Sequence, residues 1–293
     1  MNTAAALRLA TACLERHIGY IFDVFSIAEP TSVTLPLLAK TISKFSPLVG
    51  NLIEASVVDV LNQERRFQRL GQWERQDPEF PDALFVGNIK PAPGVEIKAW
   101  LPLSTEITAR FRESQARLRS HQTNIALLAW LPENIIYGRP KLIDVCIVPG
   151  LSVARSRDQH YHNPPDYLVL EPEDTTSRTR NLQQTNTYGF KWQGTSRQFH
   201  NAERVVRSWG KSGKRYDHGK VYQQKLRALM GRYPYRLDTN YAKMDRIQNR
   251  EIEIFKERVL NKDISGMTLH EWVELLRKED SNLIKQALKK SRQ

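Results

Sequence analysis

The residues between positions 81 and 98 offer two carboxylates and an amine in a pattern that suits hydrolytic chemistry. The segment reads PDALFVGNIKPAPGVEIK, with Asp82 near its start and Glu96 and Lys98 at its end. Mg²⁺ prefers oxygen ligands and keeps several waters of its own, so one or two carboxylates suffice to hold it. The ion lowers the pKa of a bound water, and a nearby lysine stabilises negative charge that develops on a phosphate.

A β-hairpin would bring these three side chains together. Two runs with strand character, Asp82 to Gly87 and Val95 to Leu101, are joined by a connection that contains glycine and proline. Because side chains alternate along a strand, Glu96 and Lys98 project to one face and their apolar neighbours to the other. Asp82 joins them if the strands pair. The alternative is a surface hairpin with scattered charges.

This pattern resembles the motif of the PD-(D/E)XK nuclease superfamily, and within it the type II restriction endonucleases. Pro81-Asp82 matches its first half and Glu96-Ile97-Lys98 its second, with thirteen residues between Asp82 and Glu96. The resemblance implies that Asp82 and Glu96 ligate one or two Mg²⁺ ions per active site. It also implies that Lys98 orients or activates the attacking water.

The elements around the hairpin follow the order of that nuclease core, in which helices flank a mixed sheet. Pro47 to Glu64 carries an apolar stripe that predicts a helix, and Ser104 to about Ser120 predicts another. The apolar runs Asn124 to Leu131 and Lys141 to Val148 predict buried central strands. Between the first helix and the hairpin, an early strand has no clear position. The resemblance covers residues 47–150, about a third of the chain.

Two further acids stand in this predicted core. In restriction endonucleases, a helix before the catalytic strands often carries an additional acidic residue into the site, and Glu54 is the candidate here by resemblance. A solvated helix carboxylate is the alternative. Asp144 lies inside an apolar run, where a charge needs a partner. It is either a site residue or a paired structural residue, and the second interpretation is favoured.

Further helices are predicted at both ends of the chain. Apolar residues recur at helical spacing over Thr3 to Phe25, Thr34 to Lys44, Asn240 to Leu260 and Leu269 to about Lys290. Thr268 follows a break at Gly266 and can cap the last of these helices. The prediction is an α/β protein with a restriction-endonuclease-like core. Its parts are an N-terminal helical region (1–46), the core (47–150), and a basic recognition region with C-terminal helices (151–293), or one continuous domain.

The positive charge is concentrated in one fifth of the chain. The 293 residues include 44 Lys and Arg against 32 Asp and Glu, for a net charge of +12. The window from Arg178 to Arg236 holds fourteen basic residues and two acids, Glu203 and Asp217, and therefore carries an excess of twelve by itself. The rest of the chain balances to neutral. Such a segment predicts a polyanionic partner.

The residues interleaved with these charges favour double-stranded DNA as that partner. Arginine and lysine neutralise phosphates, while arginine, asparagine and glutamine make paired hydrogen bonds to base edges. A solvated basic face that binds RNA or nothing specific is the alternative. The candidate DNA-binding residues are Arg178, Arg180, Gln183, Gln184, Asn186, Lys191, Arg197, Arg204, Arg207, Lys211, Lys214 and Arg215.

Composition restricts the class of protein further. With 40% apolar and 26% charged residues, the chain has the composition of an ordinary soluble globular protein. Two cysteines, Cys13 and Cys146, do not form a disulfide framework, which favours a reducing cytoplasm. The resemblance to restriction endonucleases implies that this cytoplasm is prokaryotic. The sequence contains no run of eighteen apolar residues and no signal-peptide pattern, so neither membrane insertion nor secretion is expected.

The resemblance thus implies a Mg²⁺-dependent, site-specific endonuclease of a restriction system, which hydrolyses phosphodiester bonds in double-stranded DNA. A homodimer is expected, because a two-fold dimer cuts both strands symmetrically. A cognate DNA methyltransferase is implied genetically, not as a bound subunit. Two alternatives are a repair or recombination nuclease of the same superfamily and a non-catalytic DNA-binding protein.

Overall fold

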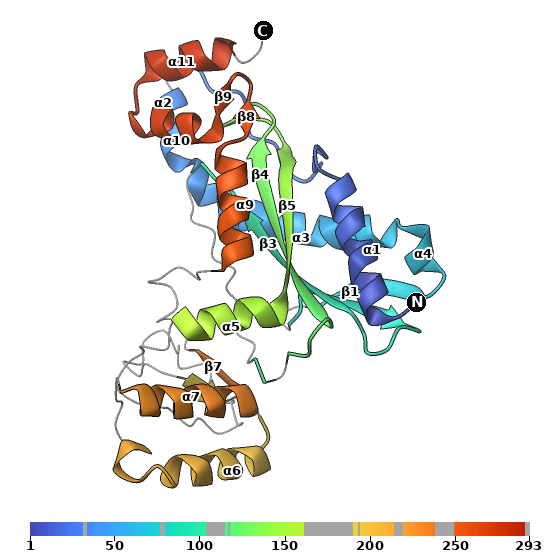
Figure 1. Cartoon of the computed structure of the whole chain (residues 1–293). Helices are drawn as coiled ribbons and strands as arrows, with labels where there is room; N and C mark the ends of the chain where they lie inside the picture. The colour runs from blue at the N-terminus through green and yellow to red at the C-terminus, as the bar shows by residue number, and fades with distance from the viewer. Residues whose placement is uncertain are drawn as a thin grey trace. The chain divides into compact units, whose positions relative to one another are not determined.

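The computed structural model describes residues 1–31, 34–76, 80–103, 115–116, 118–160, 190–192, 194–213, 219–237 and 249–290 (Figure 1). The chain divides into two compact units. The first comprises Met1–Ile107, His121–Val148 and Arg250–Gln293, and the second comprises Thr108–Ser120 and Pro149–Asn249. The C-terminal residues therefore belong with the first unit, whereas the sequence grouped them with the basic region.

A five-stranded mixed sheet forms the centre of the first unit, as an α/β fold requires. Its strands lie in chain order, from β1 to β5. β1 pairs with β2 and β2 with β3 in antiparallel fashion, whereas β3 and β4 are parallel. The strands are β1 (Gly71–Arg75), β2 (Ala83–Gly87), β3 (Gly94–Trp100), β4 (Thr123–Pro132) and β5 (Pro140–Pro149).

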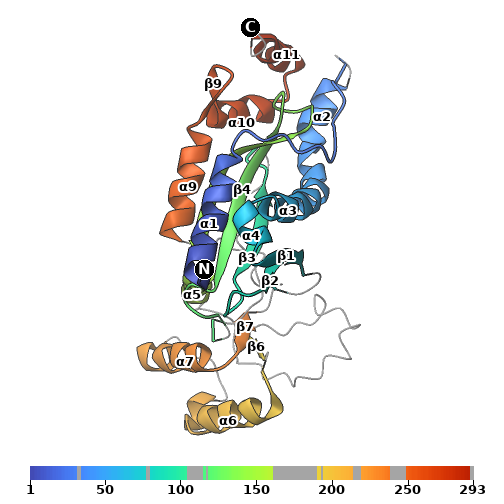
Figure 2. The same cartoon turned by 90° about the vertical axis from the view of Figure 1, so that its right-hand side faces the viewer.

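Helices cover both faces of this sheet. Figure 2 shows α3 on one side of β4 and α9 on the other. A Cβ built on Gly50 of α3 would lie 3.6 Å from Cβ of Ala99, and the ring of Phe255 of α9 lies 5.8 Å from that of Trp100. The helices of this unit are α1 (Thr3–Arg16), α2 (Leu35–Thr41), η1 (Ile42–Phe45), α3 (Ser46–Asn62), α4 (Arg65–Gln68), α9 (Arg250–Leu260), α10 (Leu269–Arg277) and α11 (Ser281–Lys290).

The predicted strands are confirmed. The hairpin corresponds to β2 and β3, and the two apolar runs correspond to β4 and β5. From Ile125 onwards every residue of β4 is buried, which explains its continuous apolar sequence. The early strand that the sequence could not place is β1. The helix predicted over residues 104–120 lies largely outside the described residues.

An aromatic cluster supports the hairpin from the β1 side. Phe67 of α4, Trp73 of β1 and Phe85 of β2 are all buried, with ring centroids 5.4 to 5.6 Å apart. The side-chain amide of Asn62 binds the backbone of Trp73 as both donor and acceptor. These contacts attach β1 and β2 firmly to the end of α3.

The N-terminal helix is shorter than its apolar pattern predicts. It was expected to extend to Phe25, but α1 ends at Arg16. The following residues instead bond to the β5 region: the N–H of Gly19 donates to the carbonyl of Leu142 and that of Phe22 to the carbonyl of Pro140. The sheet thus supplies backbone partners that a longer helix would otherwise have provided internally.

The C-terminal segment contains two helices where one was predicted. Glu279 has a φ of 53°, which ends the first, and the carboxylate of Asp280 accepts from the N–H groups of Asn282 and Leu283 at the start of α11. The predicted cap is confirmed, since Thr268 and Glu271 form a reciprocal capping box on α10. A short hairpin of β8 (Asp263–Ile264) and β9 (Met267–Thr268) precedes it.

The second unit is mainly helical in its described residues. Its elements are α5 (Gly150–His160), β6 (Phe190–Trp192), α6 (Ser196–Arg207), η4 (Gly210–Gly213), α7 (Lys220–Arg232) and β7 (Tyr235–Leu237). β6 and β7 pair in antiparallel fashion. Across the part of the chain that is described, no helix combines the length and apolarity needed to cross a membrane.

Candidate active site

Strand β3 presents Glu96 and Lys98 on the same face of the sheet. The strand is held in parallel register with β4 along its whole length, from Gly94 opposite Thr123 to Trp100 opposite Ala129. Alternation along the strand places Glu96, Lys98 and Trp100 on one face. Ala99, which packs against α3, belongs to the other face. The predicted sharing of a face by Glu96 and Lys98 is therefore observed.

The register of the hairpin brings Asp82 opposite Glu96. Ala83 pairs with Val95 and Leu84 with Gly94, and one further step along this register aligns Asp82 with Glu96. The backbone N–H of Asp82 donates to Oε2 of Glu96 at 3.1 Å, and Oδ2 of Asp82 accepts from the N–H of Ile97 at 2.7 Å. The Asp82 carboxylate thus accepts from a backbone donor of β3 that lies just beyond the residues that β3 pairs with β2.

Lys98 completes the group, which we call the carboxylate–lysine cluster (Asp82, Glu96 and Lys98). Its Nζ lies 3.1 Å from Oδ2 of Asp82 and 2.7 Å from Oε1 of Glu96. It also donates to the carbonyl oxygen of Ile97 at 2.9 Å. Two carboxylate oxygens and one backbone carbonyl oxygen therefore converge on a single cation. We call these three atoms the oxygen nest.

Close packing at the base of the hairpin holds Asp82 in place. Pro81 is buried, and a Cβ added to Gly94 would lie 2.5 Å from its Cγ and 3.2 Å from Oγ1 of Thr123. Only a residue without a side chain allows β3 to approach the proline this closely. The proline that begins the motif therefore has a packing role next to the acid.

Burial controls the electrostatics of the cluster. The side chain of Glu96 is 7% exposed, compared with 23% for Asp82 and 24% for Lys98. Burial raises the pKa of the Glu96 carboxyl to about 7; the charge of Lys98 opposes this shift and that of Asp82 adds to it. Burial alone would lower the pKa of Lys98, but the charges of Glu96 and Asp82 outweigh it and raise that pKa above its usual value.

Glu54 acts on the same cluster from α3. Its negative charge contributes to the raised pKa of Lys98, after the contributions of Glu96 and Asp82. The helix that carries it packs on β3, where Gly50 lies against Ala99. The carboxylate is half-buried. The charge of Glu54 thus favours the charged form of Lys98, whereas direct binding of a metal ion by Glu54 stays a prediction.

The donor set of the cluster fits a hard divalent cation. Among the described residues, no group of three or more histidine, cysteine, aspartate or glutamate side chains could hold a metal ion. The oxygen nest nevertheless combines two carboxylates with the carbonyl of Ile97, and all three already accept hydrogen bonds from one cationic group. Mg²⁺ needs no more protein ligands than these, because water and substrate phosphate complete its shell.

Sequence reasoning missed the role of the Ile97 backbone. Its N–H orients Asp82 and its carbonyl oxygen belongs to the oxygen nest. No residue type signals a backbone contribution, since every amino acid except proline offers the same two groups. The register of β2 against β3 is the signal that could have located it.

Asp144 is paired with basic side chains, as the favoured sequence interpretation requires. Its side chain is 7% exposed, and it accepts from Arg258 at 2.9 and 3.2 Å and from Lys262 at 3.2 Å. Burial would raise the pKa of this carboxyl, but the hydrogen bonds from Arg258 and the charge of Lys262 lower it below its ordinary value. The network joins β5 to α9.

Five of the candidate DNA-binding residues lie on described elements of the second unit. Arg197, Arg204 and Arg207 are exposed on α6, and Lys211 is exposed in η4. Lys191 lies in β6, which pairs with β7. The others lie outside the described residues: Arg178, Arg180, Gln183, Gln184, Asn186, Lys214 and Arg215.

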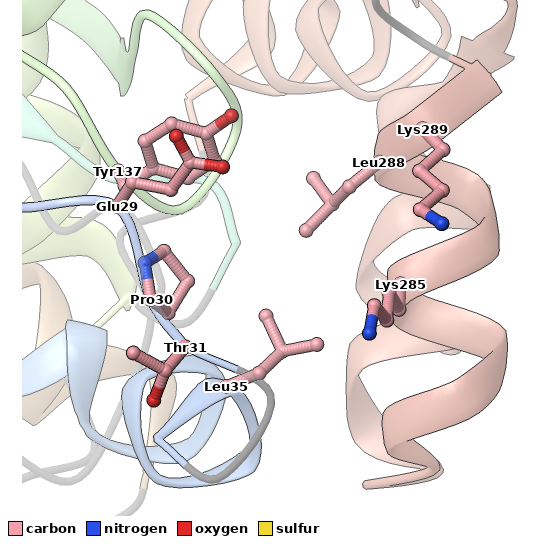
Figure 3. A pocket seen from close by; sticks show the side chains of 8 residues that line it. All are labelled: Glu29, Pro30, Thr31, Leu35, Tyr137, Lys285, Leu288 and Lys289. Atoms are coloured by element: carbon pink, nitrogen blue, oxygen red, sulfur yellow. The ribbon is translucent and has the colours of Figure 1, made fainter.

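A separate pocket of the first unit lies between α11 and the start of α2 (Figure 3). Leu35 and Leu288 point into it from opposite sides, and Tyr137 lies beside Glu29. Its lining is completed by Pro30, Thr31, Lys285 and Lys289. It contains no member of the carboxylate–lysine cluster.

Comparison with protein-family models, with curated proteins and with solved structures finds no match for this chain. The class of site is therefore defined by its own geometry: a pair of acids and a lysine at the end of a β-hairpin in a mixed sheet.

Proposed function

We propose that this protein is a Mg²⁺-dependent endonuclease that hydrolyses double-stranded DNA at a specific sequence, as type II restriction enzymes do. The observation that supports this most is the convergence of Asp82, Glu96 and Lys98, which lie 16 residues apart at most, on one point of a five-stranded mixed sheet. Helix α3, the β2–β3 hairpin and strands β4 and β5 follow one another along the chain. Together with the helix expected over residues 104–120, this is the order that the resemblance to the nuclease core implies.

Each residue of the cluster has a distinct role in this proposal. Asp82, Glu96 and the carbonyl of Ile97 would hold Mg²⁺, which when bound supplies a water of lowered pKa and neutralises phosphate charge. Asp82 is kept in position by the N–H of Ile97, and Glu96 by the N–H of Asp82. Lys98 orients the attacking water and stabilises the extra negative charge on the phosphorus centre. Hydrolysis of this kind requires no covalent bond between the protein and DNA.

Recognition of DNA is assigned to the basic region. The exposed arginines of α6 and Lys211 of η4 supply positive charge in the second unit. Phosphate contacts position a protein on the duplex, while contacts to base edges select the sequence. A homodimer would place two clusters on the two strands. A methyltransferase that protects host DNA would accompany such an enzyme genetically.

The test is incubation of the purified chain with plasmid DNA of known sequence, with and without Mg²⁺. Discrete, reproducible fragments that require the metal ion support the proposal. Smearing, or preferential cleavage of a branched junction over linear DNA, would instead indicate a nonspecific or structure-directed nuclease. A salt-sensitive gel shift without cleavage would indicate a DNA-binding protein that lacks this activity.

Variants connect the activity to the cluster. Asp82→Ala and Lys98→Ala should abolish cleavage while DNA binding survives. Asp59→Ala is the matched control, because Asp59 is exposed on α3 and lies outside the cluster. Cleavage at a near wild-type rate by either cluster variant would show that the active site is elsewhere.

A further inference from the structure

The ammonium group of Lys98 occupies the place that a divalent cation would need. Its Nζ lies within 3.1 Å of every atom of the oxygen nest: Oδ2 of Asp82, Oε1 of Glu96 and the carbonyl oxygen of Ile97. A Mg²⁺ ion bound to these oxygens would lie about 2.0–2.1 Å from each. The ammonium group and the metal ion cannot share that position, because they would overlap sterically and their positive charges would repel each other.

We propose that Lys98 is an internal placeholder for the divalent cation, so that metal binding at this site is an exchange in which the ammonium leaves the oxygen nest. This inference rests on the proposed function, because it concerns the same site. The two carboxylates are bound to a cation both before and after the exchange, first to the ammonium group and then to the metal ion. It also places Lys98 beside the metal ion rather than between its ligands.

The side chain of Lys98 has the freedom that this exchange requires. It is 24% exposed, and its flexible stem of four carbons allows the ammonium to move without a shift of the backbone. β3 itself stays fixed by its register with β4. The negative charge of Glu54 also acts on this ammonium.

If the ammonium group of Lys98 competes with the metal ion for the same three oxygens, Lys98 should lower the affinity of the site for the metal ion. Calorimetric titration of Mn²⁺ into the full chain at pH 8, without DNA, measures this directly. We expect Lys98→Met to bind Mn²⁺ on the order of tenfold more tightly than the wild type, because no internal cation competes for the three oxygens. Lys90→Met is the matched control for loss of one positive charge, since Lys90 is exposed in the connection between β2 and β3. Its affinity should equal that of the wild type.

A second measurement distinguishes displacement of the Lys98 ammonium from simple charge repulsion between Lys98 and the metal ion. It uses the wild type and therefore does not depend on the folding of a variant. An amine-acetylating reagent is applied with and without saturating Mn²⁺, and the modified lysines are quantified by mass spectrometry. Release from three hydrogen-bond acceptors should increase the acetylation of Lys98 several-fold, while that of Lys90 stays constant.

The outcomes are distinguishable. Equal or weaker Mn²⁺ binding by Lys98→Met, or unchanged acetylation of Lys98 with the metal ion, overturns the placeholder role even if the wild type cleaves DNA. Absence of Mn²⁺ binding in the wild type and in both variants, together with absence of cleavage, overturns both this inference and the proposed function.

Discussion

The backbone N–H of Asp82 donates a hydrogen bond to Oε2 of Glu96 over 3.1 Å, so the two acids are joined by the main chain as well as through Lys98. The reciprocal bond, from the N–H of Ile97 to Oδ2 of Asp82, fixes the other partner. Each carboxylate is thereby oriented by the backbone of the segment that carries the other. A site of this kind is preorganised by backbone hydrogen bonds between β3 and the residue that precedes β2.

The buried carboxyl of Glu96 predicts a pH-dependent stability. Its pKa is raised to about 7 by burial, so the folded protein retains a proton that the unfolded chain loses near pH 4.5. The free energy of unfolding should therefore fall as the pH rises from about 4.5 to 7, by up to about 3 kcal/mol from this group. The raised pKa of Lys98 lies outside this interval.

Urea denaturation at pH 5 and pH 8 measures this contribution. Glu96→Gln should lose most of the fall in stability between the two pH values, because the amide does not ionise. Glu274→Gln, at an exposed position on α10, controls for the loss of a glutamate. If the pH dependence of Glu96→Gln equals that of the wild type, burial does not control this carboxyl.

The contact between Gly94 and Pro81 predicts that Gly94→Ala damages the site. The new Cβ would meet Cγ of Pro81 at 2.5 Å, and a rigid ring cannot yield as a flexible side chain does. We expect a loss of stability of about 1–3 kcal/mol. A displaced Asp82 should lower the cleavage rate roughly 10- to 100-fold.

Gly50→Ala is the matched control for this substitution. Its Cβ would lie at an ordinary 3.6 Å from Ala99, in the interior of α3. Alanine favours the helix over glycine by about 0.5–1 kcal/mol, so this variant should be at least as stable as the wild type. Thermal denaturation and a cleavage assay of both variants test the difference, and equal behaviour would rule out a special role for the Gly94 contact.

The network around Asp144 should be structural and not catalytic. Arg258→Leu removes two of its charged hydrogen bonds and leaves a carboxylate that is 7% exposed with Lys262 as its remaining charged partner among those described. We expect a loss of about 2–3 kcal/mol in the free energy of unfolding. The metal-dependent cleavage rate of the folded variant should be unchanged.

Arg277→Leu is the corresponding control on α10. Its partner is Glu274, and the two side chains are 71% and 50% exposed. An exposed pair contributes little, so the change should be within about 0.5 kcal/mol. Chemical denaturation of both variants distinguishes the buried network from the surface pair, and similar losses would contradict the assignment.

The arginines of α6 should contribute to DNA affinity through phosphate contacts. Replacement of exposed Arg197 and Arg204 by alanine should weaken binding to all sequences. Each phosphate contact that is lost should lower the slope of log affinity against log salt by about 0.9. Fluorescence anisotropy across a salt series measures this slope. Arg8→Ala, at an exposed position on α1, should leave it unchanged, and an unaltered slope in the α6 variant would exclude this helix from the interface.

Local patterns located the elements of the core. Alternation and turn residues identified the hairpin, and continuous apolar runs identified β4 and β5, because a strand buried on both faces needs apolar side chains throughout. Thr268 marked the start of α10 through its capping chemistry. The same reasoning applies to the start of α11, since Asp280 is a typical capping residue.

Apolar spacing overestimated α1, because it does not distinguish residues that face a helix core from residues that pack elsewhere. Ile18 is 43% exposed, and Ile21 forms an isolated bridge with Lys141 of β5. The end of the helix depends on backbone partners more than 100 residues away in the chain. Such partners have no signature in the local sequence.

The sequence by itself determined which side chains could meet: two acids and a lysine whose spacing matches the two strands of a hairpin. The tertiary structure decided how deeply those side chains are buried and which groups they contact. Burial raises the pKa of Glu96, and the register of β2 against β3 brings Asp82 to Glu96 and to the backbone of Ile97. Asp144 likewise acquires its partners from α9 and the residues just after it, over 100 residues later. Spacing along a chain fixes local geometry, whereas desolvation and long-range pairing arise only when distant segments pack together.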